Sequence, residues 1–177
     1  MPLIQVCARK QVNSNWCWAT CAQMVLETYG FKEGTSQSAV VGAANSGHVE
    51  NSQGTVIEVC GVVKKLSGSK VQMDRRERAL TVEELRIVIA AGGLVVADIG
   101  GHMVLVQGVG DKTTDVFVCD PDSTKSPSAG ELRGVRQKYD DIKANWLRSG
   151  YVYAYAVGEV SKGSILPAEK TDEKNNN

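Results

Sequence analysis

The chain changes character within one stretch, Asn13-Ser14-Asn15-Trp16-Cys17-Trp18-Ala19-Thr20-Cys21-Ala22. The side chains of residues 13–15 can accept hydrogen bonds from the free N–H groups of a first helical turn. From Trp18 to Tyr29 apolar residues recur at helical spacing, and Gly30 is a suitable residue to end a helix. The pattern predicts a central core helix over about residues 16–29 with Cys17 at its N-terminus.

The predicted position of Cys17 favours a reactive thiol. Unpaired N–H groups and the positive end of the helix dipole stabilise a thiolate, so the pKa of a thiol there can fall from about 8.5 toward neutrality. A free cysteine is also a common small core residue, and position alone does not separate the two interpretations. The rest of the chain has to decide between them.

Composition limits the class of protein. At 177 residues and 42% hydrophobic content, the chain fits a single domain over 1–160, followed by a polar tail over 161–177 that we predict to be disordered. Twenty basic and twenty acidic residues balance, which gives no general attraction to nucleic acid or to an anionic membrane. The most apolar stretch, 94–109, contains Asp98, His102 and glycines, so we expect no membrane span.

The cysteine content and the N-terminal sequence predict the cellular compartment of the protein. Five cysteines, an odd number without a regular framework, indicate thiols in a reducing compartment. The first residues lack the basic region and apolar core of a signal peptide. We therefore expect a cytoplasmic protein in the cell that makes it.

The order of predicted elements indicates an α+β fold. Helices come first and antiparallel strands second, so the first helix should pack against a sheet formed later in the chain. Residues 123–130 are rich in serine and proline and are predicted to form a loop. The other predicted helices are 35–44, 55–66, 81–91 and 140–147, and the predicted strands are 70–74, 94–99, 102–108, 115–120, 132–139 and 151–157.

The clearest hairpin joins strands 102–108 and 115–120. If it folds symmetrically about Asp111, His102 lies directly opposite Asp120 on the same face, where a carboxylate can orient an imidazole. A shift of one residue would turn one of the two side chains away. Each residue alone has an ordinary explanation, a histidine at a strand end and a turn-forming aspartate before Pro121. Together they suggest the second and third members of a Cys-His-acid arrangement.

Two further polar residues bear on this arrangement. His48, the other histidine of the chain, lies in the predicted loop 45–54 without a matching acid, so His102 is the preferred base. Gln11 precedes Cys17 by six residues, and its amide, with the backbone N–H of Cys17, could donate to an oxyanion. The alternative for Gln11 is a solvated surface glutamine, and Gln5 is a weaker candidate for the same role.

We predict no metal and no organic cofactor. Cys21, Cys60 and Cys119 are interpreted as structural residues. A zinc site requires closely spaced Cys and His ligands, and Cys17-x-x-x-Cys21 with two distant histidines fits that requirement poorly.

These residues resemble the catalytic set of papain-like cysteine peptidases, over roughly residues 5–157. Gln11 followed by five residues and Cys17-Trp18 is similar to the family's oxyanion glutamine and nucleophile, and His102 and Asp120 keep its chain order. The local sequence around these residues resembles that of compact bacterial members, namely the double-glycine leader peptidases of bacteriocin exporters and avirulence-type effector proteases. The stretches that carry this likeness are Asn15-Trp16-Cys17-Trp18-Ala19, Gly101-His102-Met103-Val104 and Val118-Cys119-Asp120-Pro121.

The chain also departs from parts of that family. Plant and lysosomal relatives have small residues before the cysteine and an asparagine as third member, whereas this chain has Trp16 and Asp120, which excludes a close tie to them. No transporter segments follow in this sequence, so we do not expect the exporter role of the leader peptidases from this likeness.

The resemblance implies a papain-like fold with the catalytic cysteine at the start of the central helix. It implies a cysteine endopeptidase in which Cys17 is the nucleophile, His102 the general base and acid, Asp120 the orienting acid and Gln11 the oxyanion donor. Two alternatives stay open: an acyltransferase or transglutaminase-like enzyme with the same triad, and a degenerate papain-like binding module. We further expect a protein or peptide substrate, and a bacterial effector or toxin protease delivered by a secretion system and restrained by a cognate inhibitor or immunity protein.

Overall fold

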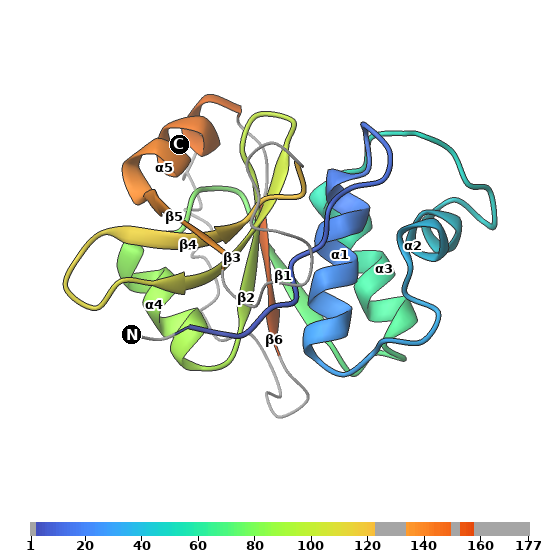
Figure 1. The fold of residues 1–177 in the computed structure, drawn as a ribbon, viewed down its shortest axis with the longest axis horizontal. Helices are drawn as coiled ribbons and strands as arrows, with labels where there is room; N and C mark the ends of the chain where they lie inside the picture. Colours follow the sequence, from blue (N-terminus) through green and yellow to red (C-terminus); the bar gives the residue numbers. More distant parts are fainter. Residues whose placement is uncertain (1–2, 123–133, 150–152, 158–177) are drawn as a thin grey trace, which may run out of the picture.

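A computed structural model of the protein describes residues 3–122, 134–149 and 153–157 (Figure 1). Its helices are α1 (Cys17–Thr28), α2 (Gln37–Ala44), α3 (Val56–Leu66), α4 (Val82–Ala90) and α5 (Tyr139–Ser149). Its strands are β1 (Gln72–Arg76), β2 (Leu94–Asp98), β3 (Met103–Val109), β4 (Asp115–Cys119), β5 (Val135–Lys138) and β6 (Tyr153–Val157). The elements lie close to their predicted positions. The loop predicted at 123–130 and the tail predicted at 161–177 fall outside the described residues.

The strands form one antiparallel sheet in the order β1-β6-β2-β3-β4-β5. Figure 1 shows α1, α2 and α3 on one side of this sheet and α4 and α5 on the other. The late strand β6 lies between the edge strand β1 and β2, so the end of the described chain is inserted inside the sheet. The arrangement confirms the predicted α+β fold with α1 against the sheet.

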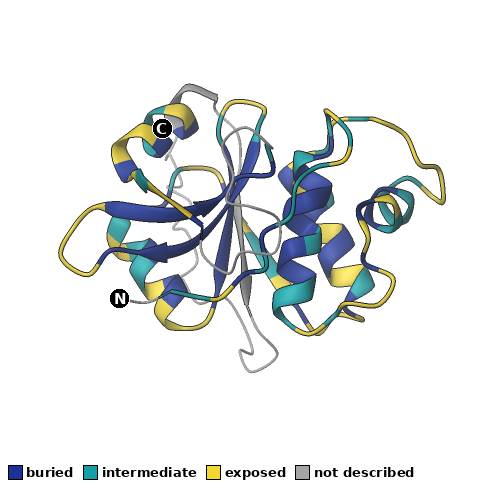
Figure 2. Cartoon of the chain, in the orientation of Figure 1, coloured by how far each residue is buried: buried dark blue, intermediate teal, exposed yellow. Residues whose placement is uncertain are grey.

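Two hydrophobic cores lie on opposite faces of the sheet. Leu94 and Val96 of β2 belong to the core shared with α1, α2 and α3. Val95 and Ala97 belong to the core shared with α4 and α5. Figure 2 shows the central strands buried throughout. Because helices cover both faces, apolar residues are favoured on both sides of β2, which explains the continuous apolar run Leu94–Ala97 in an antiparallel sheet.

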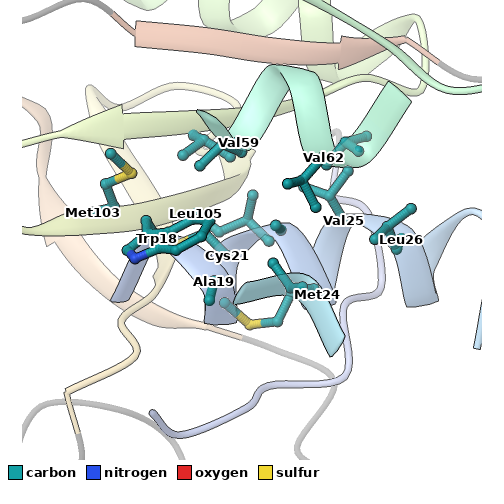
Figure 3. Packing of buried hydrophobic residues seen from close by; sticks show 14 of the residues in the cluster. Trp18, Ala19, Cys21, Met24, Val25, Leu26, Val59, Val62, Met103 and Leu105 are labelled. Carbon is teal, nitrogen blue, oxygen red and sulfur yellow. The ribbon is translucent and has the colours of Figure 1, made fainter. Parts of the chain in front are cut away.

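Helix α1 is the centre of the first core (Figure 3). Trp18, Cys21 and Leu26 are fully or almost fully buried, and the cluster also contains Val59 of α3 and Leu105 of β3. Burial of each large apolar side chain contributes about 1.5–3 kcal/mol relative to exposure. The apolar stripe seen in the sequence therefore holds the start of α1 against the sheet.

The polar residues before α1 do not cap it as predicted. The N-cap position is Trp16, and no side chain caps the first turn. Instead, Asn15 Nδ2 donates to the carbonyl of Asn51 at 2.9 Å, and Asn51 Nδ2 donates to Ser14 Oγ at 3.1 Å. These side chains connect the helix start to the loop after α2, and they leave the N–H groups of the first turn of α1 available.

The β3–β4 hairpin differs from its predicted register by two residues. The observed pairs include Leu105 with Cys119. One residue further along this register, Val104 stands opposite Asp120. The turn spans Gly110 to Asp115, and the Gly110 N–H donates to the carbonyl of Asp115 at 2.8 Å, so the turn is not centred on Asp111. A bulge in β3 follows Val106. His102 is therefore a diagonal neighbour of Asp120. A shift of two residues keeps both side chains on one face, and a diagonal neighbour is still within reach of a long side chain.

In the described part of the chain, no helix is both long enough and apolar enough to cross a lipid bilayer.

Candidate active site

A pocket of about 160 Å³ opens at the N-terminus of α1. It is lined by residues from three segments: Ser14, Asn15 and Cys17 at the helix start, Gln53, Gly54 and Thr55 before α3, and Asp98, Gly101, His102 and Met103 at the β2–β3 turn. The predicted nucleophile Cys17 and the predicted base His102 therefore line the same pocket, although they come from segments far apart in sequence.

The β2–β3 turn positions His102. Gly100 and Gly101 have φ angles of 84° and 85°, a left-handed conformation that glycine adopts without strain. The Ile99 N–H donates to the carbonyl of His102 at 2.8 Å, and the Gly101 N–H donates to Asp98 Oδ1 at 2.8 Å. The two glycines thus hold His102 at the edge of the pocket.

Asp120 contacts the imidazole of His102 directly. His102 Nε2 and Asp120 Oδ1 are 2.6 Å apart, and the Asp120 side chain is only 4% exposed. The Asp122 N–H donates to the same Asp120 oxygen at 2.8 Å. The hydrogen bond to Asp120 is the largest cause of a rise in the pKa of His102 from 6.5 to about 10, followed by a hydrogen bond with Cys17. The pair therefore favours an imidazolium at neutral pH.

Cys17 is the first residue of α1 and forms a hydrogen bond with His102. Since Nε2 of His102 faces Asp120, Nδ1 is the ring nitrogen available to the thiol. The imidazole of His102 and the uncapped N-terminus of α1 therefore meet at the Cys17 thiol. The arrangement can supply a nucleophile and a proton donor at the same place.

Three other thiols lie in environments that oppose ionisation. Burial raises the pKa of Cys21 well above its usual value, the pKa of Cys60 to about 11 and the pKa of Cys119 to about 12. Cys119 also donates to Gln107 Oε1 at 2.8 Å. These contacts fit the structural roles predicted for the three cysteines.

Gln11 lies beside the turn that leads to Cys17. Its Nε2 donates to the carbonyls of Asn13 at 3.1 Å and Ser14 at 2.7 Å, which uses both amide hydrogens. Its Oε1 is buried and has no hydrogen-bond partner among the described residues. In this structure Gln11 supports the turn, while Gln5 is exposed and lines a different pocket with Cys7 and Arg9. His48 is exposed in the loop after α2.

Sequence reasoning missed two parts of the site. Asp98 was used only to exclude a membrane span, although a lone acidic residue at the end of an apolar strand was a visible signal. The other part is the segment 50–55, of which Gln53, Gly54 and Thr55 form a wall of the pocket. Trp16 Nε1 donates to the carbonyl of Glu50 at 2.8 Å, and Trp18 Nε1 donates to that of Ser52 at 3.1 Å. Two indole N–H groups that require acceptors were the signal for this contact.

Gly54 leads to a stability prediction. A Cβ atom at Gly54 would lie 2.3 Å from Cδ2 of the buried Trp18 ring, so we expect Gly54→Ala to lower the free energy of unfolding by about 1–3 kcal/mol. Gly61→Ala is the matched control, because a Cβ there meets nothing within 4 Å. It lies within α3, and we expect it to raise the stability by about 0.5–1 kcal/mol. Urea unfolding of both variants measures the effects, and wild-type stability of Gly54→Ala would contradict the close packing of this wall.

No group of three or more His, Cys, Asp and Glu side chains is placed to hold a metal ion within residues 3–122, 134–149 and 153–157.

Comparison with known protein families assigns the chain to one of them. The sequence model of the peptidase C39-like family matches residues 3–154. The chain belongs to this family. Peptidase C39 domains are papain-like cysteine peptidases, so the resemblance seen in the sequence and the assignment as a cysteine protease are confirmed. A search of curated proteins found no match.

Solved structures of C39 peptidases share the fold. The peptidase domain of Streptococcus ComA, a bi-functional ABC transporter involved in a quorum sensing pathway, aligns with a TM-score of 0.61 at 13% identity, covering 88% of this chain and 98% of that one. A double glycine motif protease from an AMS/PCAT transporter, in complex with its leader peptide, aligns with a TM-score of 0.60 at 13% identity, covering 88% and 94%. A protein from Bacillus anthracis described as a C39-like peptidase aligns with a TM-score of 0.58 at 16% identity, covering 84% and 92%. At such identities the likeness concerns the fold alone.

Proposed function

We propose that this C39-like peptidase is an endopeptidase that hydrolyses peptide bonds through an acyl-enzyme on Cys17. The observation that supports the proposal is His102, in contact with Asp120 Oδ1 at 2.6 Å and hydrogen-bonded to Cys17. The thiolate attacks the scissile carbonyl, His102 protonates the leaving amine, and the neutral imidazole then takes a proton from the water that hydrolyses the thioester. Asp120 orients the ring and stabilises its charged form.

Two groups are proposed to hold the oxyanion. The first is the backbone N–H of Cys17, because no side chain caps the first turn of α1. The second is the amide of Gln11, as the sequence predicts. Gln11 would have to exchange one of its two carbonyl partners for the oxyanion. The buried and unpartnered Oε1 of this amide, among the described residues, supports such a rearrangement, because the resting contacts do not satisfy the side chain.

The substrate class follows from the same proposal. A solved relative was crystallised with a leader peptide and is named for a double glycine motif, so we propose a peptide or protein substrate with small residues before the cut. The alternative, acyl transfer to an amine, would use the same thioester. The mass of the product separates the two reactions, because hydrolysis adds water and transfer adds the amine.

The experiment that tests the proposal is the mapping of new N-termini. A bacterial lysate is treated with the wild-type protein, with Cys17→Ala or with Cys60→Ala, and new N-termini are identified by mass spectrometry. We expect cleavage by the wild type and by Cys60→Ala, because burial keeps the Cys60 thiol of the wild type protonated and therefore unreactive. We expect no cleavage by Cys17→Ala. Cleavage that persists in a folded Cys17→Ala variant would overturn the proposal.

The effector or toxin role remains a proposal from the sequence. It includes production in the cytoplasm, delivery by a secretion system without a cleaved signal peptide, and restraint by an inhibitor or immunity protein. Co-purification of a neighbour-encoded protein that blocks cleavage would support this role, and cleavage confined to a leader peptide of the producing cell would contradict it.

A further inference from the structure

Asp98 is a charged residue of the pocket that the proposed acyl-enzyme chemistry does not use. It is the last residue of β2 and lines the same pocket as Cys17 and His102. Only 5% of the residue is exposed, so its carboxylate is largely withdrawn from bulk water. A buried charge at the mouth of a reactive site requires an explanation.

A structural role accounts for the backbone contacts of this carboxylate. Asp98 Oδ1 accepts the Gly101 N–H at 2.8 Å, and the Gly100 N–H is a second backbone partner, so the carboxylate helps to shape the turn that presents His102. The Gly101 contact requires an acceptor oxygen and no charge, so an asparagine could make it equally well. The negative charge of Asp98 is not explained by the turn.

The charge of Asp98 is poorly compensated. Burial is the largest influence on its pKa and raises it, while the Gly101 and Gly100 N–H groups and the charge of His102 act in the opposite direction without cancelling it. The His102 ring is itself held by Asp120 at 2.6 Å. A cation that entered the pocket would therefore find a desolvated carboxylate without a dedicated counter-ion.

We infer that Asp98 is a specificity residue that binds the ammonium or guanidinium group of a lysine or arginine of the substrate, close to the scissile bond. The inference rests on the proposed function, because it assigns a substrate feature to the same pocket. Charge-assisted hydrogen bonds to a carboxylate are stronger than neutral ones, and the long side chains of lysine and arginine can carry the charge into a recess.

A test that does not depend on turnover uses small thiol reagents on Cys17. The intact protein is treated with aminoethyl methanethiosulfonate, which is cationic, or with methyl methanethiosulfonate, which is neutral, and labelling of the Cys17 peptide is followed by mass spectrometry. Both reagents form the same type of mixed disulfide and release methanesulfinate. We expect the ratio of the two rates, cationic over neutral, to fall about tenfold in Asp98→Asn, since the variant keeps the Gly101 contact and loses the charge.

The comparison isolates Asp98 from the other charges of the site. Attraction between the cationic reagent and the Cys17 thiolate itself is present in both proteins and cancels in the comparison. Glu50→Gln is the matched control, because it removes an exposed carboxylate that does not line the pocket, keeps the backbone carbonyl that accepts from Trp16, and should leave the ratio unchanged. An equal ratio in Asp98→Asn and wild type would overturn the inference.

Peptide cleavage supplies the second measurement. Peptides that carry lysine, arginine or uncharged norleucine at each position around the cut are compared by kcat/KM. We expect the wild type to prefer the basic residue at one position by about tenfold and Asp98→Asn to lose that preference. Cys17-dependent cleavage without a basic preference would overturn the inference and leave the proposed function standing. Discrimination by the thiol reagents without any peptide cleavage would support the cation site and refute the proposed hydrolysis.

Discussion

Replacement of His102 by alanine is expected to lower kcat/KM for peptide cleavage by about 10⁴-fold. The variant loses the group that protonates the leaving amine and then activates the water, since the imidazole of His102 is hydrogen-bonded to Cys17 and contacts Asp120 at 2.6 Å. Initial rates with a substrate identified from the new N-termini measure the effect. A circular dichroism spectrum and a thermal melt show whether the variant is folded.

His48→Ala is the matched control for this experiment. His48 is exposed in the loop after α2, so its removal should change kcat/KM by less than about threefold. A folded His102→Ala variant with near wild-type activity would refute the proposed base. A large loss in His48→Ala would transfer the role to the other histidine.

Replacement of Asp120 by asparagine is expected to lower kcat/KM by about 10²-fold and to change its pH dependence. The hydrogen bond to Asp120 is the largest cause of the rise in the pKa of His102 to about 10. In the wild type the imidazolium therefore persists until the pH approaches 10, and activity should fall above that value as His102 loses its proton. In Asp120→Asn the fall should occur at lower pH. An unchanged basic limb would contradict the role of Asp120.

The same pair predicts a change of stability with pH. Because the pKa of His102 is raised from 6.5 in the unfolded reference to about 10 in the folded protein, its contribution is complete below pH 6.5 and is lost as the pH rises toward 10. The stability difference between wild type and Asp120→Asn should therefore shrink over this interval. Urea unfolding at several pH values measures it, and a difference that grows with pH would contradict the assignment.

Local patterns were sufficient to predict the elements that hold the site. The apolar stripe of α1 and the predicted strands 94–99 and 102–108 depend on residues close in sequence, and each appears in the structure. The hairpin prediction shows the limit of such reasoning. The prediction that His102 and Asp120 lie on the same face of the hairpin was right, because side chains along a strand alternate with a period of two. The predicted register was wrong by two residues because the turn extends to Asp115 and a bulge follows Val106, and the sequence pattern marked neither.

The sequence by itself determined that an apolar helix begins at Cys17 and that His102 and Asp120 leave neighbouring strands on one face, because helical and strand periodicities are local properties of the chain. Only the tertiary structure decided what surrounds these residues. It placed β6 between β1 and β2 and turned the Gln11 amide toward Asn13 and Ser14. It also engaged the predicted capping residues with Asn51 and left the buried charge of Asp98 facing the thiol pocket. Each of these outcomes depends on contacts between segments far apart in sequence, and burial, which sets the charge balance of the pocket, exists only after those segments have packed together.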